Sequence, residues 1–166
     1  MLISYLIIFV LIILDLVLKL IFSNIFQVGQ ISEVIPNVLR FGYIQNTGAS
    51  FGILEGEQFL FLIITIIALI FFGYLFSQSN LKTKRFYTIG VIFLIAGTLG
   101  NAIDLMVYGY VIDYIQIPFL PFVGNTYFNL ADTLLVFGVA MLAIEILILD
   151  TLRNKKKKEG NNDDKV

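Results

Sequence analysis

Four long apolar runs alternate with polar stretches along this chain, at residues 2–22, 59–76, 86–103 and 128–149. About 20 helical residues cross the roughly 30 Å hydrocarbon core of a bilayer, so each run is long enough to form one spanning helix. The chain of 166 residues is 58% hydrophobic and only 14% charged, which is typical of a membrane protein rather than a soluble one. The pattern therefore predicts four transmembrane helices.

Two connecting stretches, residues 23–58 and 105–127, contain several Gly and Pro turn signals. Within them, residues 38–46 are partly alternating, and residues 111–115 are β-branched and aromatic around a single acid. Both segments are typical of short strands. We therefore expect an all-α membrane protein with four transmembrane helices and a small extracytoplasmic β-containing region formed by the outer loops.

The basic residues are segregated, because nine of the eleven Lys and Arg residues lie in residues 82–85 or 153–165. With four spans these two regions share a side, and the positive-inside rule assigns that side to the cytoplasm. Both termini are then cytoplasmic, and the two loops with turn signals lie outside. Beside membrane spans, a basic tail indicates topology rather than a nucleic-acid partner. We expect residues 1–150 to form one domain and residues 151–166 a charged, disordered tail.

The first apolar run contains two charged residues, Asp15 and Lys19. A charge in hydrocarbon costs roughly 2.5–3.5 kcal/mol even on the lenient insertion scale, so each charge needs a partner. At i,i+4 the two side chains share a helix face and can neutralise one another. They form either a structural ion pair or part of a polar site that supports or faces a substrate.

Further polar residues collect at the outer ends of the third and fourth runs. The third run leads into Asn101 and Asp104, and the fourth opens with Asn129 and Asp132, which share one helix face. Asp113 lies in the loop that joins these two runs. The predicted topology brings all five to one surface of the membrane.

The first outer loop ends in a tight turn of small residues that begins at Asn46 and includes Gly48. Asn46 either caps this turn or offers its amide to the backbone of a substrate. Ser50, in the same turn, together with Lys19 is a weaker candidate for a Ser-Lys nucleophile.

Asp113 and Asp132 are the strongest candidates for chemistry. A lone Asp at a helix start is usually a cap, which is the structural alternative for Asp132. Two carboxylates held close together cannot both ionise easily, so they share a proton and titrate as a pair. Such a pair can activate a water as general base and protonate a leaving amine as general acid, without a cofactor.

The chain has no cysteine and no histidine, which removes several classes of function. A cysteine nucleophile, a Ser-His dyad, an HExxH metallopeptidase and a Cys/His zinc site all require residues that are missing. The acid pair requires no cofactor, so we expect the chemistry to use neither a metal nor a cofactor.

Five blocks of the sequence, in one order, resemble the lipoprotein signal peptidases, also called signal peptidase II, which are bacterial membrane aspartyl proteases. The resemblance covers residues 2–149. The blocks are Asp15-x-x-x-Lys19, Asn46-Thr-Gly48-Ala-Ser-Phe, Gly100-Asn101-Ala-Ile-Asp104, Val111-Ile-Asp113 and Phe128-Asn129-Leu-Ala-Asp132.

The resemblance implies that Asp113 and Asp132 are catalytic and that the other block residues bind substrate or support the pair. It implies cleavage of prolipoproteins before the diacylglyceryl-modified cysteine, at the outer face of the bacterial cytoplasmic membrane. It also implies membrane lipids as surroundings, a monomeric enzyme and inhibition by globomycin-type cyclic peptides. The family usually has Arg after the Gly-Asn-x-x-Asp block, whereas this chain has Leu105.

Two other classes of function use the same residues differently. Intramembrane acids also occur along proton paths, so a small proton-coupled transporter component is one alternative. A non-catalytic membrane protein that binds lipidated peptides, with structural acids, is the other. A transporter would spread its acids across the bilayer, whereas these acids gather at one face.

Overall fold

The computed structural model describes residues 2–47, 58–121 and 123–149. Within these ranges, four helices are long and apolar enough to cross a membrane. They confirm the predicted four-helix membrane fold. The helices are α1 (Leu2–Ile25), α2 (Gln58–Ser77), α3 (Arg85–Tyr108) and α4 (Leu130–Ile144), and α4 continues into a π-helical turn at Glu145–Leu149.

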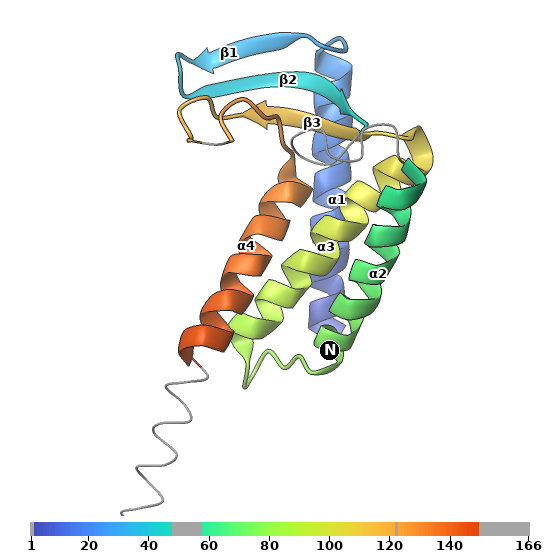
Figure 1. The fold of residues 1–166 in the computed structure, drawn as a ribbon, viewed down its shortest axis with the longest axis vertical. Coiled ribbons are helices and arrows are strands. Elements are labelled where there is room, and N and C mark those ends of the chain that lie inside the picture. The colour runs from blue at the N-terminus through green and yellow to red at the C-terminus, as the bar shows by residue number, and fades with distance from the viewer. Residues whose placement is uncertain (1, 48–57, 122, 150–166) are drawn as a thin grey trace, which may run out of the picture.

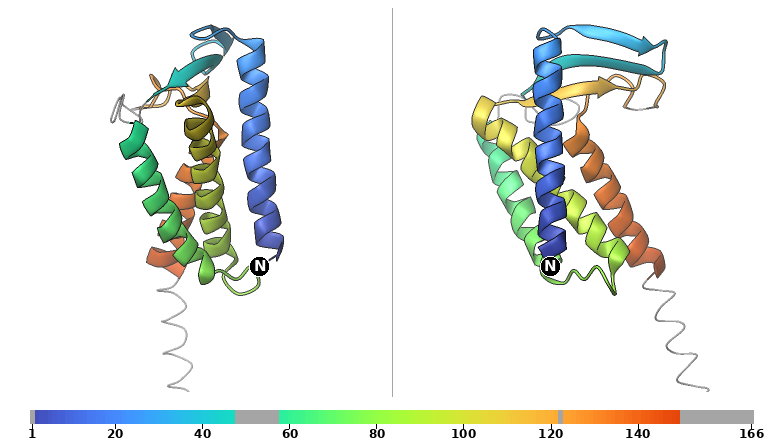
Figure 2. Two further views of the ribbon diagram at one scale, coloured as in Figure 1. Left: turned by 90° about the vertical axis from the view of Figure 1, so that its right-hand side faces the viewer. Right: turned by 180° about the vertical axis from the view of Figure 1, so that it is seen from behind.

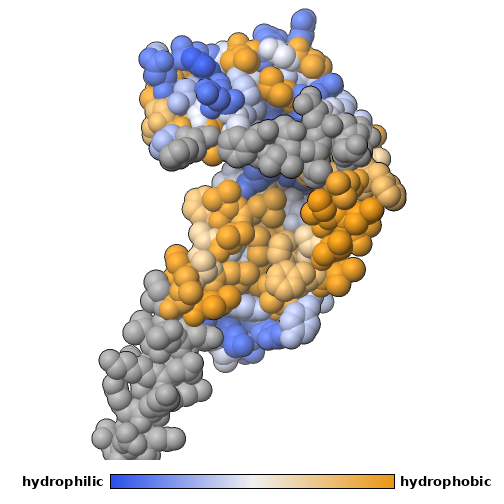
Figure 3. Space-filling model, viewed as in Figure 1, coloured by the Kyte–Doolittle hydropathy of each residue, from blue (hydrophilic) through white to orange (hydrophobic). Residues whose placement is uncertain are grey.

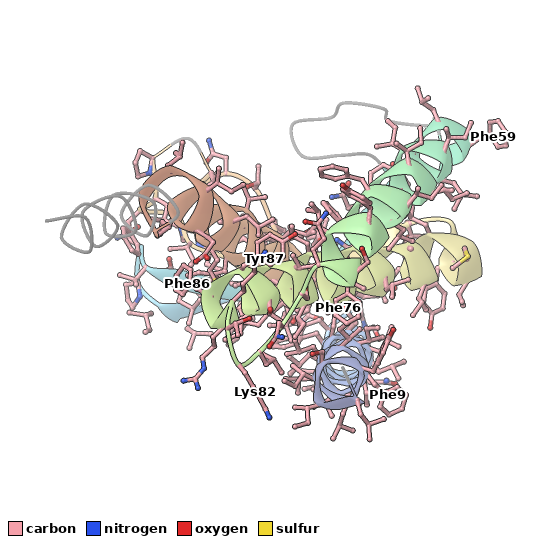
Figure 4. The ribbon with its side chains drawn as sticks, turned by 90° about the horizontal axis from the view of Figure 1, so that it is seen from below. Phe9, Phe59, Phe76, Lys82, Phe86 and Tyr87 are labelled. Atoms are coloured by element: carbon pink, nitrogen blue, oxygen red, sulfur yellow. The ribbon has the colours of Figure 1, made fainter. Side chains whose placement is uncertain are left out.

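Helix α3 is the central helix of the bundle and contacts the other three (Figure 1, Figure 4). The buried core takes side chains from all four helices. The outward faces of α1 and α2 carry large exposed aliphatic and aromatic residues, as expected where lipid is the solvent. The core residues are Ile8, Phe76, Val91, Ile92, Ala96 and Leu134.

Small residues allow α3 and α4 to pack closely. A Cβ atom on Gly97 would lie 2.5 Å from the backbone oxygen of Ala131, and one on Gly138 would lie 2.9 Å from the backbone oxygen of Gly90. Neither position accepts a larger side chain without a shift of the opposite backbone. This is the packing mode that small residues give transmembrane helices.

Helix α3 extends beyond the predicted end of the third run at residue 103. It continues to Tyr108 and stops at Gly109, which has a φ of 78° and whose N–H donates to the carbonyl oxygen of Leu105 at 3.0 Å. Glycine adopts this left-handed conformation without a Cβ clash, so it ends the helix. The first residues of the expected second outer loop, Leu105 among them, are therefore helical.

A three-stranded antiparallel sheet lies at one end of the bundle, formed by β1 (Ile31–Ile35), β2 (Leu39–Asn46) and β3 (Val111–Gln116) in the order β1-β2-β3 (Figure 1). Strands β2 and β3 confirm the two predicted extended segments, whereas β1 was not predicted. The β2–β3 pairing joins the two connecting stretches and places Ile44 opposite Asp113.

The sheet is anchored to the helices on two sides. A bridge between Ile115 and Phe128 ties β3 to the start of α4. On the other side, the ring of Phe22 in α1 stacks on Tyr114 with a centroid distance of 4.4 Å. Figure 2 shows α1 rising alongside the sheet. These contacts fix the sheet above the polar ends of α3 and α4.

Candidate active site

Asp113 lies in the middle of β3, with 2% of its surface exposed. Each of its carboxylate oxygens accepts a hydrogen bond from an asparagine amide at 2.8 Å, Oδ2 from Asn46 Nδ2 and Oδ1 from Asn129 Nδ2. The side chain of Asn46 therefore contacts Asp113 directly, in addition to any role in the turn that follows Asn46.

Asp132 lies in the first turn of α4 and forms a capping box with Asn129. The Asn129 Oδ1 accepts from the Asp132 N–H at 2.9 Å, and the Asp132 Oδ2 accepts from the Asn129 N–H at 3.1 Å. The other carboxylate oxygen, Oδ1, accepts from Asn101 Nδ2 at 2.8 Å. The capping expected of an Asp at a helix start is thus present, and one carboxylate oxygen also contacts a residue of α3.

The fully buried Asn129 connects the two acids, because its backbone N–H binds Asp132 while its side-chain amide binds Asp113. The same amide nitrogen lies 3.1 Å from Asn101 Oδ1 and 3.2 Å from the carbonyl oxygen of Ile112. The two acids come from a strand and a helix start, and a single residue sets their relative position.

Burial, and then the negative charge of Asp132, raise the pKa of Asp113 from 3.8 to about 8, against the lowering effect of its amide donors and of Lys19. A carboxyl group with this pKa keeps its proton at neutral pH. The pair therefore offers both a proton donor and a proton acceptor, as acid–base catalysis requires.

Lys19 is 1% exposed and its ammonium group contacts two carboxylates, Asp15 at 2.8 Å and Asp104 at 2.9 Å. It also donates to Asn101 Oδ1 at 2.9 Å and to the carbonyl oxygen of Gly100 at 3.5 Å. The ion pair expected from the i,i+4 spacing is present. It is part of a larger polar cluster between α1 and α3 that also orients Asn101.

The two acids of this cluster hold the backbone beside the candidate catalytic pair. Asp15 Oδ1 accepts from the N–H of Ala131 at 2.8 Å, and Asp104 Oδ2 accepts from the N–H of Ile112 at 3.0 Å. Ala131 immediately precedes Asp132, and Ile112 immediately precedes Asp113. Each buried acid of the cluster thus fixes the residue next to one member of the pair.

The structure brings together eight of the nine residues predicted from the sequence. Six of them are less than 9% exposed, Asp132 is half-buried, and Asn46 joins them through Asp113. Gly48, the ninth, and Ser50 of the alternative dyad lie outside the described residues. Figure 3 shows hydrophilic residues recessed in a hollow between the sheet and the apolar flank of the bundle.

Tyr114 is a contributor that sequence reasoning did not identify. Its hydroxyl oxygen accepts from the N–H of Leu130 at 3.1 Å, which helps to satisfy the start of α4. Burial raises the pKa of this phenol, so it stays neutral. Its position directly after Asp113 in the sequence was the only available signal.

The fold and this polar centre define a helical membrane protein that carries a pair of carboxylates, one buried and one half-buried, beneath a small sheet. The chain belongs to the signal peptidase II family, since the family model described as signal peptidase (SPase) II matches residues 7–148. The family places it among the membrane proteases of lipoprotein processing.

Individual relatives agree with this assignment over most of their length. The lipoprotein signal peptidase of Latilactobacillus sakei is 43% identical over 120 residues, which are 72% of this chain and 77% of that protein. That of Staphylococcus aureus strain JH9 is 40% identical over 148 residues, 89% of this chain and 88% of that protein. A bacterial membrane enzyme solved by the in meso method at 2.3 Å resolution superposes with a TM-score of 0.77 at 37% identity and covers 87% of both chains.

Proposed function

We propose that this protein is an aspartyl endopeptidase in which Asp113 and Asp132 share one proton and act together on a peptide bond. The observation that carries the proposal is the pair itself, the buried Asp113 and the half-buried Asp132 joined through Asn129, with the pKa of Asp113 raised to about 8. The described residues supply no cysteine or histidine with which to attack a peptide.

The chemistry follows from the shared proton. The ionised carboxylate removes a proton from a water molecule, which attacks the carbonyl carbon of the scissile bond. The protonated carboxyl group then donates its proton to the leaving amine, and the pair returns to its starting charge. Asn46, Asn101 and Asn129 hold the carboxylate oxygens in place through amide donors, so the pair needs little rearrangement during the reaction.

The substrate assignment rests on family membership. We propose a prolipoprotein cut before its diacylglyceryl-modified cysteine, with the polar centre at the outer leaflet and the lipid chains beside the apolar flank of the bundle. In the same way we propose a monomeric enzyme that globomycin-type cyclic peptides inhibit.

The test is cleavage of a lipidated precursor peptide by purified Asp113→Asn, Asp132→Asn and the double variant. An amide preserves the shape of each side chain but removes its titrating proton, so each single variant is expected to lose a factor of about 10³ or more in turnover. Because the acids act as a unit, the double variant should be hardly slower than either single variant.

Glu33→Gln is the matched control, because Glu33 is an exposed carboxylate on β1 that pairs with Arg40 and not with the site. It should keep full activity. Thermal unfolding in detergent must show that the Asn variants are folded. Near-normal turnover in either folded single variant would return both acids to structural roles.

A further inference from the structure

The start of α4 is held by side chains that come from three parts of the chain. The first N–H groups of a helix have no partner within the helix, so other groups must accept from them. Here each of the first three N–H groups of α4 donates to a side chain. The pairs are Leu130 to the Tyr114 hydroxyl at 3.1 Å, Ala131 to Asp15 Oδ1 at 2.8 Å and Asp132 to Asn129 Oδ1 at 2.9 Å. Asp15 belongs to the cluster around Lys19 and Asn129 is the helix cap, so Tyr114 is the contact that comes from the sheet.

Tyr114 links the two acids by a second route. It directly follows Asp113 in β3, which crosses above the start of α4 (Figure 1), and its hydroxyl binds a residue two positions before Asp132. The backbone bridge between β3 and the segment before α4 ends at Phe128, before the helix begins. The Asn129 amide binds Asp113 from the helix cap, and the Tyr114 hydroxyl binds the helix from β3. Two links at different points restrict the rotation of α4 against β3 more than either link does alone.

The ring of Tyr114 is itself fixed by close packing. Tyr114 is 1% exposed, and its ring stacks on Phe22 of α1 with a centroid distance of 4.4 Å and an interplanar angle of 9°. Phe22 and Asp15 lie two helix turns apart in α1, so they share one face of that helix. This face therefore holds the start of α4 twice, directly through Asp15 and indirectly through the ring of Tyr114.

The hydroxyl of Tyr114 acts as a neutral group. Burial, and then the negative charge of Asp15, raise the pKa of the Tyr114 phenol, against the lowering effect of the Leu130 N–H. The phenol therefore keeps its proton over the range in which Asp113 titrates, up to a pKa of about 8. Because the side chain is buried and its oxygen binds a backbone N–H, it offers no surface to a substrate. Its effect on the reaction must pass through the position of α4.

We propose that Tyr114 is a positioning residue whose hydroxyl holds the first turn of α4, so that Asp132 stays within proton-sharing distance of Asp113. The inference rests on the acid-pair mechanism proposed above. Without the hydroxyl, the N–H of Leu130 loses this acceptor and the first turn of α4 shifts towards another one. The two carboxyl groups then share their proton less well. Turnover falls, whereas the surface that binds the substrate is unchanged.

Tyr114→Phe tests this, because phenylalanine keeps the ring and its stack on Phe22 but lacks the hydroxyl. In cleavage of a lipidated precursor peptide, kcat should fall about tenfold while KM changes by less than about twofold. The alkaline limit of the pH–rate profile should also move, since the charge of Asp132 is one of the causes that raise the pKa of Asp113. A looser pair lowers that pKa, so activity should decline at a pH about half a unit below the wild-type limit.

Tyr43→Phe is the matched control, because it removes another buried hydroxyl from the same sheet. Tyr43 lies in β2 and is 8% exposed, and its hydroxyl bonds with the Tyr110 hydroxyl at 3.2 Å and with the side-chain amide of Gln45 at 3.1 Å. Neither partner lies in α4. This variant should keep the kcat, the KM and the alkaline limit of wild type, even where its thermal stability falls as much as that of Tyr114→Phe.

Three results would overturn the proposal. Wild-type kinetics in Tyr114→Phe would mean that the hydroxyl has no part in the reaction. A higher KM with unchanged kcat would place Tyr114 in substrate binding. Equal losses in Tyr114→Phe and Tyr43→Phe, with no shift of the alkaline limit in either, would mean a general loss of rigidity.

Asp113→Asn, measured in the same assay, separates this inference from the mechanism on which it rests. If Asp113→Asn is inactive and Tyr114→Phe has wild-type kinetics, the positioning role alone fails. If folded Asp113→Asn keeps wild-type turnover, the acid pair itself is wrong and the positioning role fails with it.

Phe22→Leu is a second variant in case Tyr114→Phe does not fold, which thermal unfolding in detergent decides. Leucine removes the ring that fixes Tyr114 but leaves the hydroxyl in place. This variant should lower kcat several-fold at unchanged KM and move the alkaline limit in the same direction. Wild-type kinetics in folded Phe22→Leu would overturn the proposal equally.

Discussion

At the scale of single residues, the site works by restricting which groups can be charged. Asp113 is enclosed by a strand, a helix start and two amide donors, so water cannot stabilise its negative charge. Lys19 has two closer acids of its own, Asp15 and Asp104. The result is a carboxyl group that keeps its proton at neutral pH, next to one that accepts hydrogen bonds from Asn101 and from the Asn129 backbone.

This environment predicts a pH dependence of stability with a definite sign. Folding raises the pKa of Asp113 from 3.8 to about 8, so within this window the folded protein holds a proton that the unfolded chain has released. The stability linked to this proton is fully present below the pKa of Asp113 in the unfolded chain. It is lost as pH rises to the pKa of Asp113 in the folded protein, by at most about 1.4 kcal/mol per pH unit. Thermal unfolding across this range should show wild-type stability falling with pH and Asp113→Asn falling less.

Glu33→Gln should keep the wild-type slope above the ordinary titration range of a glutamate, because hydrogen bonds from the Asn37 N–H and from Arg40 lower the pKa of Glu33. Activity should follow the same proton and decline above about pH 8, where the pair loses it. Equal slopes for wild type and Asp113→Asn would show that Asp113 is ionised throughout and that the pair shares no proton.

Asn129 is predicted to have two separable functions. Its side-chain oxygen caps α4, and its amide nitrogen binds Asp113. Serine keeps a capping oxygen but has no amide, whereas alanine has neither. Asn129→Ala should lose about 1 kcal/mol more stability than Asn129→Ser.

Both Asn129 variants should lose most of their turnover, because neither contains the amide that orients Asp113. Thermal unfolding and precursor cleavage measure the two effects on the same samples. Full activity in Asn129→Ser would mean that the cap alone accounts for the role of this residue.

At the scale of the elements, the close contact of α3 and α4 controls the site. A Cβ on Gly97 would lie 2.5 Å from the Ala131 oxygen and 2.9 Å from a side-chain atom of Leu135, and Ala131 is next to Asp132. Gly97→Ala must therefore push the start of α4 outward, at a cost of about 1–3 kcal/mol. We expect lower thermal stability and a matching loss of activity.

Gly73→Ala in α2 is the matched control, because nothing lies within 4 Å of an added Cβ there. Alanine is the better helix former by about 1 kcal/mol, so this variant should be as stable as wild type or more so, with unchanged turnover. If both substitutions had the same effect, helix propensity and not packing would explain them.

The elements also show what the sequence could and could not predict. Hydrophobic run length predicts four spans, and β-branched patterns predict β2 and β3, because both signals are local. The partners of Lys19 depend on how α1 and α3 are rotated against each other, and only the Asp15 contact, one helix turn away, could be expected from spacing. Strand β1 was missed because its residues are exposed throughout and lack alternation.

Leu105 shows where a family pattern alone is insufficient. The resemblance to signal peptidase II implies Arg after the Gly-Asn-x-x-Asp block, whereas this chain has Leu105 there, directly after Asp104. Here Lys19 contacts Asp104 at 2.9 Å, and the backbone N–H of Ile112 contacts it too. The acid is therefore satisfied without a charge at position 105.

At the scale of the whole molecule, the sheet and the basic connector lie at opposite ends of the bundle. The start of α1, the turn between α2 and α3 and the end of α4 lie at one end of the bundle, and the sheet lies at the other (Figure 1, Figure 2). The connector holds Lys82, Lys84 and Arg85, whereas Arg40, at the sheet end, is paired with Glu33. Among the described residues, the Lys and Arg side chains without a carboxylate partner thus lie at one end.

The positive-inside rule then predicts that the connector end faces the cytoplasm and the sheet end faces outward. The chain has no cysteine, so single cysteines can report each side without background. Lys82→Cys in the connector and Asn125→Cys at the sheet end both replace exposed residues. With a membrane-impermeant maleimide, Asn125→Cys should be labelled in intact cells, and Lys82→Cys only after the cells are opened. Labelling of Lys82→Cys in intact cells would reverse the orientation and place the acid pair on the cytoplasmic side, where a signal peptide that has crossed the membrane could not reach it.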